Sequence, residues 1–367
     1  NRILIFLYLS SSSSKFFFSL YVYLIISSLY SEYYLFSLKS SIPYIRFILF
    51  SLALWFLIEN NKEFLKNFTI AFAITFIFAV FDGYFQYFIG HSIFGYYSAV
   101  PSRLNLSFDD KMILGGYLSR LLPLLIALII LHITESKKQL YLLVSLLLIL
   151  SDLLIYLSGE RTAIGIATIS IIFIIIFLKK YRLIRILTLL VSISVIIIAT
   201  VVSPVTKSRN IEHTIEQMGL NDSSERIILF SGEHEKLFIN AYEIFLENKL
   251  LGSGPNTFRK HCELKYTNEN CSTHPHNTYI QILSETGIIG LLFTIVIIIY
   301  FLRLLLFHIL SFFKNKIDSL QDTQVLLITC FFCTLWPFIP SLNFFNNWIN
   351  IIYYLPVGFF LYSIYKR

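Results

Sequence analysis

Apolar runs long enough to cross a lipid bilayer recur along the whole chain, and they limit its fold more than any other feature. A bilayer about 30 Å thick requires roughly 20 mainly apolar residues per spanning helix. The 367 residues are 56% hydrophobic and only 14% charged, with a mean hydropathy of +0.71. We therefore predict an all-α integral membrane protein, a polytopic helical bundle of about ten spans. The predicted spans are residues 16–36, 41–58, 68–89, 111–131, 139–157, 162–178, 186–202, 286–310, 323–340 and 348–365.

These spans divide the chain into three predicted parts. Residues 1–202 carry the N-terminal spans, residues 203–277 form one long polar segment, and residues 278–367 carry the C-terminal spans. The sequence begins at Asn1 rather than at a methionine, and the apolar run Ile3–Leu9 is too short to span. We expect that an N-terminal part is missing.

Basic residues fall in alternate loops, and they predict the orientation. The positive-inside rule places such loops in the cytoplasm. The net charge of +7 then reflects topology, so we expect no nucleic-acid partner. Loops 90–110, 158–161, 203–277 and 342–347 are predicted to face outward. The basic loops contain Lys62 and Lys66, Lys137 and Lys138, residues 179–185, Lys314 and Lys316, and Lys366 and Arg367.

The long outward segment has the pattern of an ordered structure rather than of a tether. Asn221–Ser224 supply helix caps, and apolar residues between Ile227 and Phe245 give the following helix an apolar face. The sequence LLGSGPNTF at 250–258 predicts a sharp turn. Cys262 and Cys271 can form a disulfide if the segment faces an oxidising compartment, which would stabilise the fold by about 2–4 kcal/mol.

The stretch His274-Pro275-His276-Asn277 closes this segment and leads into a span. A helix started by Pro275 would place His276 on one stripe with Gly287 and Gly290. Near the membrane surface, the His276 imidazole could accept a proton from a sugar hydroxyl. The alternative is a histidine that only hydrogen-bonds loop carbonyls. His274 raises the question of zinc, but without suitably placed carboxylates or thiolates we expect no metal.

Several outward residues could bind an anion. Arg161 lies at the end of a span, where an arginine is costly unless it lines a polar cavity, although it could also snorkel or pair with Glu160. Arg226 opens the amphipathic helix and suits a diphosphate, but it could instead pair with a neighbouring acid. We consider Arg103, Arg259, His274 and Glu285 as further substrate-binding candidates.

Cofactor motifs are not recognised in the sequence. We find no phosphate-binding Walker loop, no dinucleotide glycine motif and no credible Ser-His-Asp spacing. No paired acidic motif indicates a metal-bound diphosphate. We therefore expect neither a cofactor nor a metal, with phosphate handled by cations alone.

Four motifs together resemble the O-antigen ligase and polymerase superfamily, bacterial inner-membrane glycosyltransferases that use polyprenyl-diphosphate-linked glycans. The family's histidine pattern is similar to His276-Asn277, nine residues, Gly287, two residues and Gly290. SGERT at 158–162 resembles a family turn, and residues 226–258 resemble its segment from a loop arginine to a G-x-G-x-x-x-F turn. WPFIPSLNFFNNW at 336–348 resembles the C-terminal span and turn of proteobacterial members.

The resemblance covers roughly residues 100–365 and implies a GT-C-like fold with a periplasmic site. It implies that Arg161 and Arg226 hold the lipid diphosphate and that His276 activates the acceptor hydroxyl. Glu160 departs from the family turn, where this position is often small and neutral, and its charge could weaken or tune Arg161.

Different functions compete for this pattern. The leading hypothesis is ligation of a glycan from polyprenyl diphosphate onto lipid A-core at the periplasmic face, with membrane lipids around the protein. Polymerisation of the carrier-linked glycan and protein O-glycosylation differ only in the acceptor. A transporter of the lipid-linked glycan should show internal repeats or broken helices at the midplane, which we do not see clearly. A structural scaffold would not need outward arginines beside a histidine turn.

Overall fold

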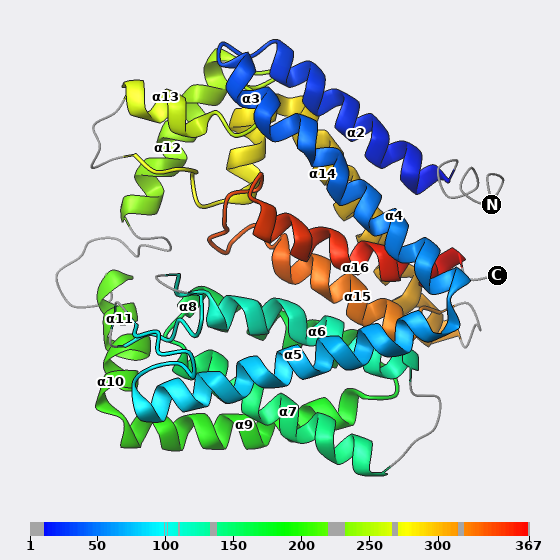
Figure 1. Cartoon of the computed structure of the whole chain (residues 1–367), viewed down its shortest axis with the longest axis vertical. Helices are drawn as coiled ribbons and strands as arrows, with labels where there is room; N and C mark the ends of the chain where they lie inside the picture. Colours follow the sequence, from blue (N-terminus) through cyan, green and yellow to red (C-terminus); the bar gives the residue numbers. More distant parts are fainter. Residues whose placement is uncertain are drawn as a thin grey trace. The chain divides into compact units, whose positions relative to one another are not determined.

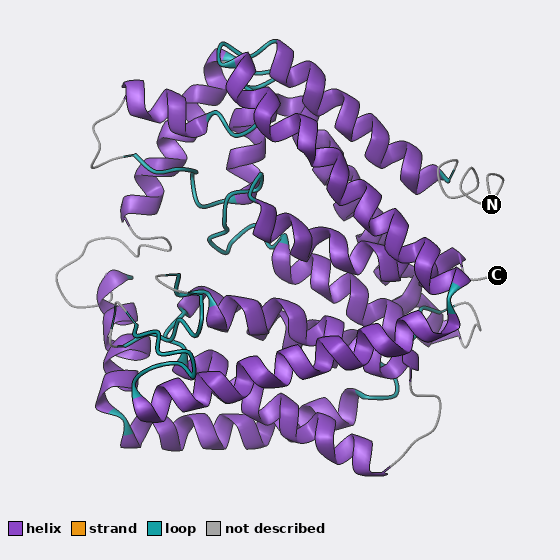
Figure 2. Cartoon of the chain, viewed as in Figure 1, coloured by secondary structure: helices purple, strands orange, loops and turns teal. Residues whose placement is uncertain are grey.

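The computed structural model describes residues 11–98, 100, 102–108, 111–132, 138–218, 232–265, 271–314 and 319–365. These residues form helices and loops without a strand (Figure 2). The expected fold class is therefore confirmed: the chain is a polytopic helical membrane protein. The apolar run Ile3–Leu9 lies outside the described residues.

Figure 1 shows the helices along the chain. They are α2 (Ser12–Leu29), α3 (Tyr34–Ser41), η1 (Ile42–Tyr44), α4 (Ile45–Asn60), α5 (Lys62–Ile89), α6 (Leu114–His132), α7 (Lys138–Leu157), α8 (Arg161–Phe177), α9 (Arg182–Val202), α10 (Pro204–Lys207), η2 (Ser208–Glu212), α11 (His213–Gln217), α12 (Gly232–Glu247), α13 (Phe258–Lys265), α14 (Thr278–Lys314), α15 (Asp322–Thr334) and α16 (Asn347–Tyr365).

Among the described residues, seven helical stretches are long and apolar enough to cross a membrane, judged by length and composition. They begin at Ser12, Tyr34, Glu63, Leu114, Arg182, Thr278 and Asn347. The predicted spans 139–157, 162–178 and 323–340 correspond instead to shorter apolar helices: Tyr141–Leu157, Arg161–Phe177 and Asp322–Thr334.

Two predicted spans are too long. The span predicted at 16–36 ends at Leu29, because the Ser31 hydroxyl accepts a hydrogen bond from Tyr33 N at 3.1 Å and holds a turn. The span predicted at 323–340 ends at Thr334, followed by two prolines at 337 and 340. Proline lacks an amide hydrogen and disfavours helix in the preceding residue, so the helix cannot continue.

The chain divides into two compact units, each built from discontinuous segments. The first unit comprises Asn1–Asn60, Leu229–Leu306 and Pro337–Arg367, and the second comprises Asn61–Ile228 and Phe307–Trp336. The sequence-ordered division at residues 202 and 277 describes position relative to a membrane and stays a prediction.

In the first unit, α4 packs along α16, and polar contacts fix their register. The Tyr44 hydroxyl donates to Asn350 Oδ1 at 2.9 Å, and the Ser51 hydroxyl donates to the Tyr354 carbonyl at 2.7 Å. These bonds satisfy buried polar groups in apolar surroundings, where an unpaired group would be costly. They hold the α16 start near the turn between α3 and α4.

In the second unit, α6 packs against α5, α7, α8 and α15, and most of its side chains are buried. Asp152, an intramembrane acid without an evident partner in the sequence, pairs here with Arg185. The two guanidinium nitrogens lie 2.8 and 2.9 Å from the carboxylate oxygens, and Ser192 Oγ donates to the same carboxylate at 2.7 Å. A buried charge pair of this kind is tolerated because both partners are hydrogen-bonded.

Candidate functional site: a histidine cluster and an arginine cluster

The histidine stretch enters α14 through a cap rather than through Pro275. Helix α14 begins at Thr278, and the Asn277 side-chain oxygen accepts hydrogen bonds from Tyr279 N at 2.9 Å and Ile280 N at 3.2 Å. Asparagine is a strong N-cap because its short side chain reaches the free amides of the first turn. The prediction that Pro275 starts the helix is therefore wrong, and His276 lies just outside the helix.

The backbone of His276 adopts a left-handed conformation, with φ of 56°. Such a conformation is uncommon for a residue other than glycine, and here hydrogen bonds hold it in place. Ser341 N donates to the His276 carbonyl at 2.8 Å, and Asn277 Nδ2 donates to the Pro337 carbonyl at 2.8 Å. The loop after α15 thus holds the backbone at His276 and Asn277.

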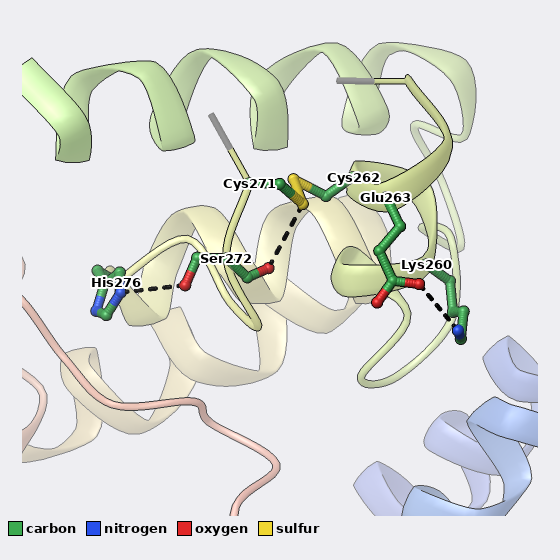
Figure 3. The surroundings of a disulfide bond; sticks show 6 residues. All are labelled: Lys260, Cys262, Glu263, Cys271, Ser272 and His276. Carbon is green, nitrogen blue, oxygen red and sulfur yellow. Dashed lines mark hydrogen bonds and ion pairs between the residues drawn. A yellow bond between two sulfur atoms is a disulfide. The ribbon is translucent and has the colours of Figure 1, made fainter. Parts of the chain in front are cut away.

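The His276 side chain is half-buried, and its Nε2 lies 3.4 Å from Ser272 Oγ (Figure 3). Two other imidazoles surround it. The ring centroid of His274 lies 4.1 Å away, and that of His234, on α12, lies 5.1 Å away. His234 was missed by the sequence prediction because its position on an amphipathic helix reads as a solvated face.

Burial within this cluster favours the neutral forms of His274 and His276. Burial, together with repulsion from His234, lowers the pKa of His276 to about 4. Burial also lowers the pKa of His274 to about 3, with further repulsion from His276 and opposed by a contact with the Ser341 carbonyl. A neutral imidazole presents a nitrogen lone pair, so His276 can accept a proton.

The prediction that one helix carries His276, Gly287 and Gly290 on a single stripe is wrong. His276 precedes α14, and the helix is interrupted at Gly287. This residue has φ of 64° and ψ of −169°, a conformation open essentially to glycine alone. A side chain there would overlap the backbone of Leu250 and Gly252. The close neighbour of Gly287 is thus a turn, not another helix.

The turn at 249–257 supplies the hydrogen bonds that the interruption leaves open. Ser253 N and Gly254 N donate to the carbonyls of Ser284 and Glu285 at 2.9 and 2.8 Å. On the other side of the interruption, Ile288 N donates to the Lys249 carbonyl at 2.9 Å. The predicted turn is therefore confirmed, and it locks the first two turns of α14 in place.

Glu285 is fully buried beneath the turn. Its Oε1 accepts from Phe258 N, the first residue of α13, at 2.8 Å, and its Oε2 accepts from Gln281 Nε2 at 3.0 Å. A carboxylate at a helix N-terminus satisfies free amides and favours the helix dipole. This arrangement fits a residue that positions α13 better than one that touches substrate.

The segment between α12 and α14 has a small core of its own. Leu237, Ala241 and Ile244 on α12 pack against Phe258 and Cys262 on α13, with Cys271 and Ile280 beside them. A disulfide joins Cys262 to Cys271, with 5.6 Å between their Cα atoms (Figure 3). The expected helical cap ahead of α12, at Asn221–Ser224, lies outside the described residues, as does Arg226.

Arg259, on α13, donates to Asn256 Oδ1 at 3.3 Å. Among the described residues, the Nε atoms of Arg259 and Arg103 are buried without a hydrogen-bond partner. Both residues are predicted substrate-binding candidates, and each has an Nε–H donor without an acceptor. Arg259 belongs to the first unit and Arg103 to the second.

In the second unit, Arg161 is the first residue of α8. A cation at a helix N-terminus opposes the helix dipole, which favours anions there. Arg103 and Arg209 both act on it electrostatically. Three arginines at a helix N-terminus are the kind of arrangement that attracts an anion with more than one negative charge.

The side chains of Arg103 and Arg209 both lie close to Gly159. Arg209 Nε donates to the Gly159 carbonyl at 3.3 Å, and Arg103 donates to the Met112 carbonyl at 2.9 Å. Burial lowers the pKa of Arg103, with Glu160 opposing and Arg209 adding to this shift. Arg209 was not predicted, because beside Lys207 in a polar segment it reads as a solvated charge.

Glu160 has a role that the sequence did not show. Its two carboxylate oxygens accept from Gly115 N at 2.7 Å and Gly116 N at 3.1 Å, which caps the start of α6. Burial raises the pKa of Glu160 to about 7, against these hydrogen bonds and the charges of Arg103 and Arg120. The residue therefore ties the SGER turn to α6 and moderates the charge around Arg103.

Residues 143–295 match the family model described as O-Antigen ligase. This segment runs from α7 into α14 and contains both the SGER turn and the histidine stretch. This match supports the resemblance of the chain to the O-antigen ligase and polymerase superfamily. No curated protein matches the chain.

The similarity to the O-antigen ligase family extends over the histidine stretch and over Arg161 and Arg209. The family implies an enzyme-like membrane protein of the ligase or polymerase type, acting on lipid-linked glycans among membrane lipids. Of the predicted site residues, Arg161, Arg259, His274, His276 and Glu285 lie in the matched segment of described residues, while Arg103 precedes it. Within the part of the chain that the structure describes, no group of three or more His, Cys, Asp or Glu residues is arranged to hold a metal ion.

Proposed function

We propose that the protein is an O-antigen ligase-like glycosyltransferase of the bacterial inner membrane. It moves a glycan from polyprenyl diphosphate to a hydroxyl of lipid A-core at the periplasmic face. The observation that carries this proposal is the family-matched segment itself, which holds a neutral, half-buried imidazole just before α14 and two arginines of the cluster, Arg161 and Arg209. These are the two kinds of group that the reaction requires.

His276 acts as the general base in this proposal. Its neutral nitrogen takes the proton of the acceptor hydroxyl, and the hydroxyl oxygen attacks the anomeric carbon of the donor sugar. A new glycosidic bond forms as the bond between that carbon and the diphosphate oxygen breaks. The displacement occurs in line, so the anomeric configuration is inverted.

The arginine cluster stabilises the leaving group. Polyprenyl diphosphate leaves with its bonding electron pair, and the growing negative charge is met by Arg161 together with Arg103 and Arg209. Arg226, which the resemblance assigns to the same task, would add a further cation. The proton taken by His276 passes to solvent, which restores the base for the next reaction.

The test is transfer in proteoliposomes that contain the full chain, a polyprenyl-diphosphate-linked glycan and lipid A-core. We expect a ladder of glycan on lipid A-core, read by gel electrophoresis and mass spectrometry. Glycan that lengthens only on its carrier would reassign the protein as a polymerase. Movement of the carrier-linked glycan across the bilayer without a new bond would make it a transporter, and either result contradicts ligation.

A further inference from the structure

A polar pocket in the first unit lies outside the histidine cluster. It has a volume of about 430 Å³ and opens between the α3–α4 turn, the turn around Asn256 and the start of α16. This volume lies in the range of pockets that hold small organic ligands, about 300–1,000 Å³. None of the proposed steps of the reaction uses it.

Two cations line this pocket, Lys39 and Arg46. No acidic side chain lines it, and within the described part of the chain neither cation forms an ion pair. Arg46 instead donates to Asn347 Oδ1 and lies 4.8 Å from the centre of the Phe47 ring. Its guanidinium is thus oriented without being neutralised, which leaves the positive charge for a ligand.

The remaining lining suits a group rich in hydroxyls. Ser40, Asn256, Asn346 and Asn347 line it with hydroxyl and amide groups, and part of their hydrogen-bonding capacity is used within the protein. Phe47 and Phe345 provide an apolar wall. A sugar ring presents the same combination, with hydroxyl groups at its edge and C–H groups on its faces.

Hydrogen bonds hold the Asn256 side chain in place at the pocket. Asn256 adopts φ of 64°, its Nδ2 donates to Ser40 Oγ at 3.0 Å, and its Oδ1 accepts from Asn343 Nδ2 at 2.9 Å. Asn343 Oδ1 in turn accepts from Gln281 Nε2 at 2.8 Å, on the first turns of α14. The pocket is therefore built before any ligand arrives, which lowers the cost of binding.

The same loop connects the pocket to the proposed base. Ser341 N holds the His276 carbonyl, and two residues later Asn343 forms part of the network around the pocket. Residues 341–347 thus contact the histidine stretch at one end and line the pocket at the other. Residues 341–347 therefore connect the lining of the pocket to the backbone of His276.

We propose that this pocket binds a phosphate-bearing sugar, and that this sugar belongs to the acceptor. The first statement rests on the cations, amides and aromatic wall of the pocket alone. The second rests on the proposed function, because it takes His276 as the base that acts on the acceptor.

Direct binding tests the first statement. The full chain in neutral-lipid nanodiscs is titrated calorimetrically with glucose 6-phosphate, with glucose and inorganic phosphate as separate arms. We expect saturable binding of glucose 6-phosphate that is tighter than that of either fragment. The variant Lys39→Gln/Arg46→Gln should weaken it about tenfold or more, since hydrogen bonds to charged groups are among the stronger ones.

Lys15→Gln is the matched control, because Lys15 is an exposed lysine of the same unit outside the pocket. It should bind glucose 6-phosphate as the wild type does. An equal loss in the control, or no saturable binding by the wild type, would overturn the pocket as a site. Equal affinity for inorganic phosphate, or displacement by phosphatidylglycerol in the nanodisc, would overturn the sugar in favour of a phosphate or lipid headgroup site.

Kinetics in the transfer assay test the second statement. The double variant should raise the KM for a phosphorylated acceptor by about the same factor as the dissociation constant, with a smaller change in the KM for the donor. An unchanged acceptor KM alongside weakened binding would separate the pocket from the acceptor. A failure of the proposed function would appear differently, as binding of the sugar phosphate without any transfer by the wild type.

Discussion

At the scale of single residues, the imidazole of His276 lies in surroundings that disfavour its charged form. Burial contributes most of this effect and His234 adds repulsion, so the pKa falls from 6.5 to about 4. A lowered histidine pKa also affects stability. The unfolded chain binds a proton at this histidine more readily than the folded chain does. The stability that comes from the neutral imidazole is therefore fully present above the unfolded pKa of 6.5 and is lost as the pH falls through about 4.

We predict that transfer activity has an acidic limb with an apparent pKa near 4, since protonated His276 cannot take a proton. His234→Gln should move this limb upward, towards 6.5 but not to it, because burial remains. His213→Gln serves as the control, since His213 lies on α11 in the second unit. The measurement is the pH dependence of kcat/KM for each variant. A limb that does not move in His234→Gln would contradict the assigned coupling.

Sequence patterns revealed some of these residues better than others. His276 and Arg161 were predicted because an imidazole or a guanidinium beside an apolar span is unusual. Arg209 and His234 were not, because each lies among polar residues and a solvated role is the ordinary one. Only the folded chain brings Arg209 to Gly159 and His234 to His276. Glu160 was recognised as a departure from the family turn. Its capping of α6 was not predicted, because the Gly115 amide that it accepts from lies 45 residues earlier in the chain.

At the scale of elements, the apolar runs predicted where helices form, and the glycines decided where α14 changes direction. The hydrophobic pattern continues through Gly287, so periodicity alone predicts an unbroken helix there. The interruption depends on the turn at 249–257, which approaches only because neither Gly287 nor Gly252 has a side chain. This geometry fixes the segment that leads from His276 into the span.

We predict that Gly287→Ala destabilises the protein by about 1–3 kcal/mol or more, because it adds backbone strain and a clash with Leu250. Gly232→Ala is the control: no atom lies within 4 Å of the added carbon, and alanine favours a helix. The thermal midpoint of the full chain in detergent reports both. Equal midpoints for Gly287→Ala and the wild type would show that the interruption is not required.

At the scale of the whole molecule, the sequence predicted a polytopic helical membrane protein, but not that each compact unit is assembled from distant segments. Local patterns carry no information about which helices pack together. The pair between Asp152 and Arg185 shows this, since one residue read as an unexplained acid and the other as part of a basic cluster. In the folded second unit, each of these two buried charges lies beside the partner that compensates it.

The central claim is that His276 is the base of a glycan transfer reaction. The measurement that tests it most directly is the initial rate of transfer to lipid A-core in proteoliposomes, comparing the wild type with His276→Ala at equal protein content. His213→Ala is measured in parallel, and thermal unfolding verifies that each variant is folded. We predict a loss of about 10²–10⁴-fold for His276→Ala, the usual contribution of a general base, and no loss for the control. A folded His276→Ala protein that transfers glycan within a few-fold of the wild-type rate would contradict the account.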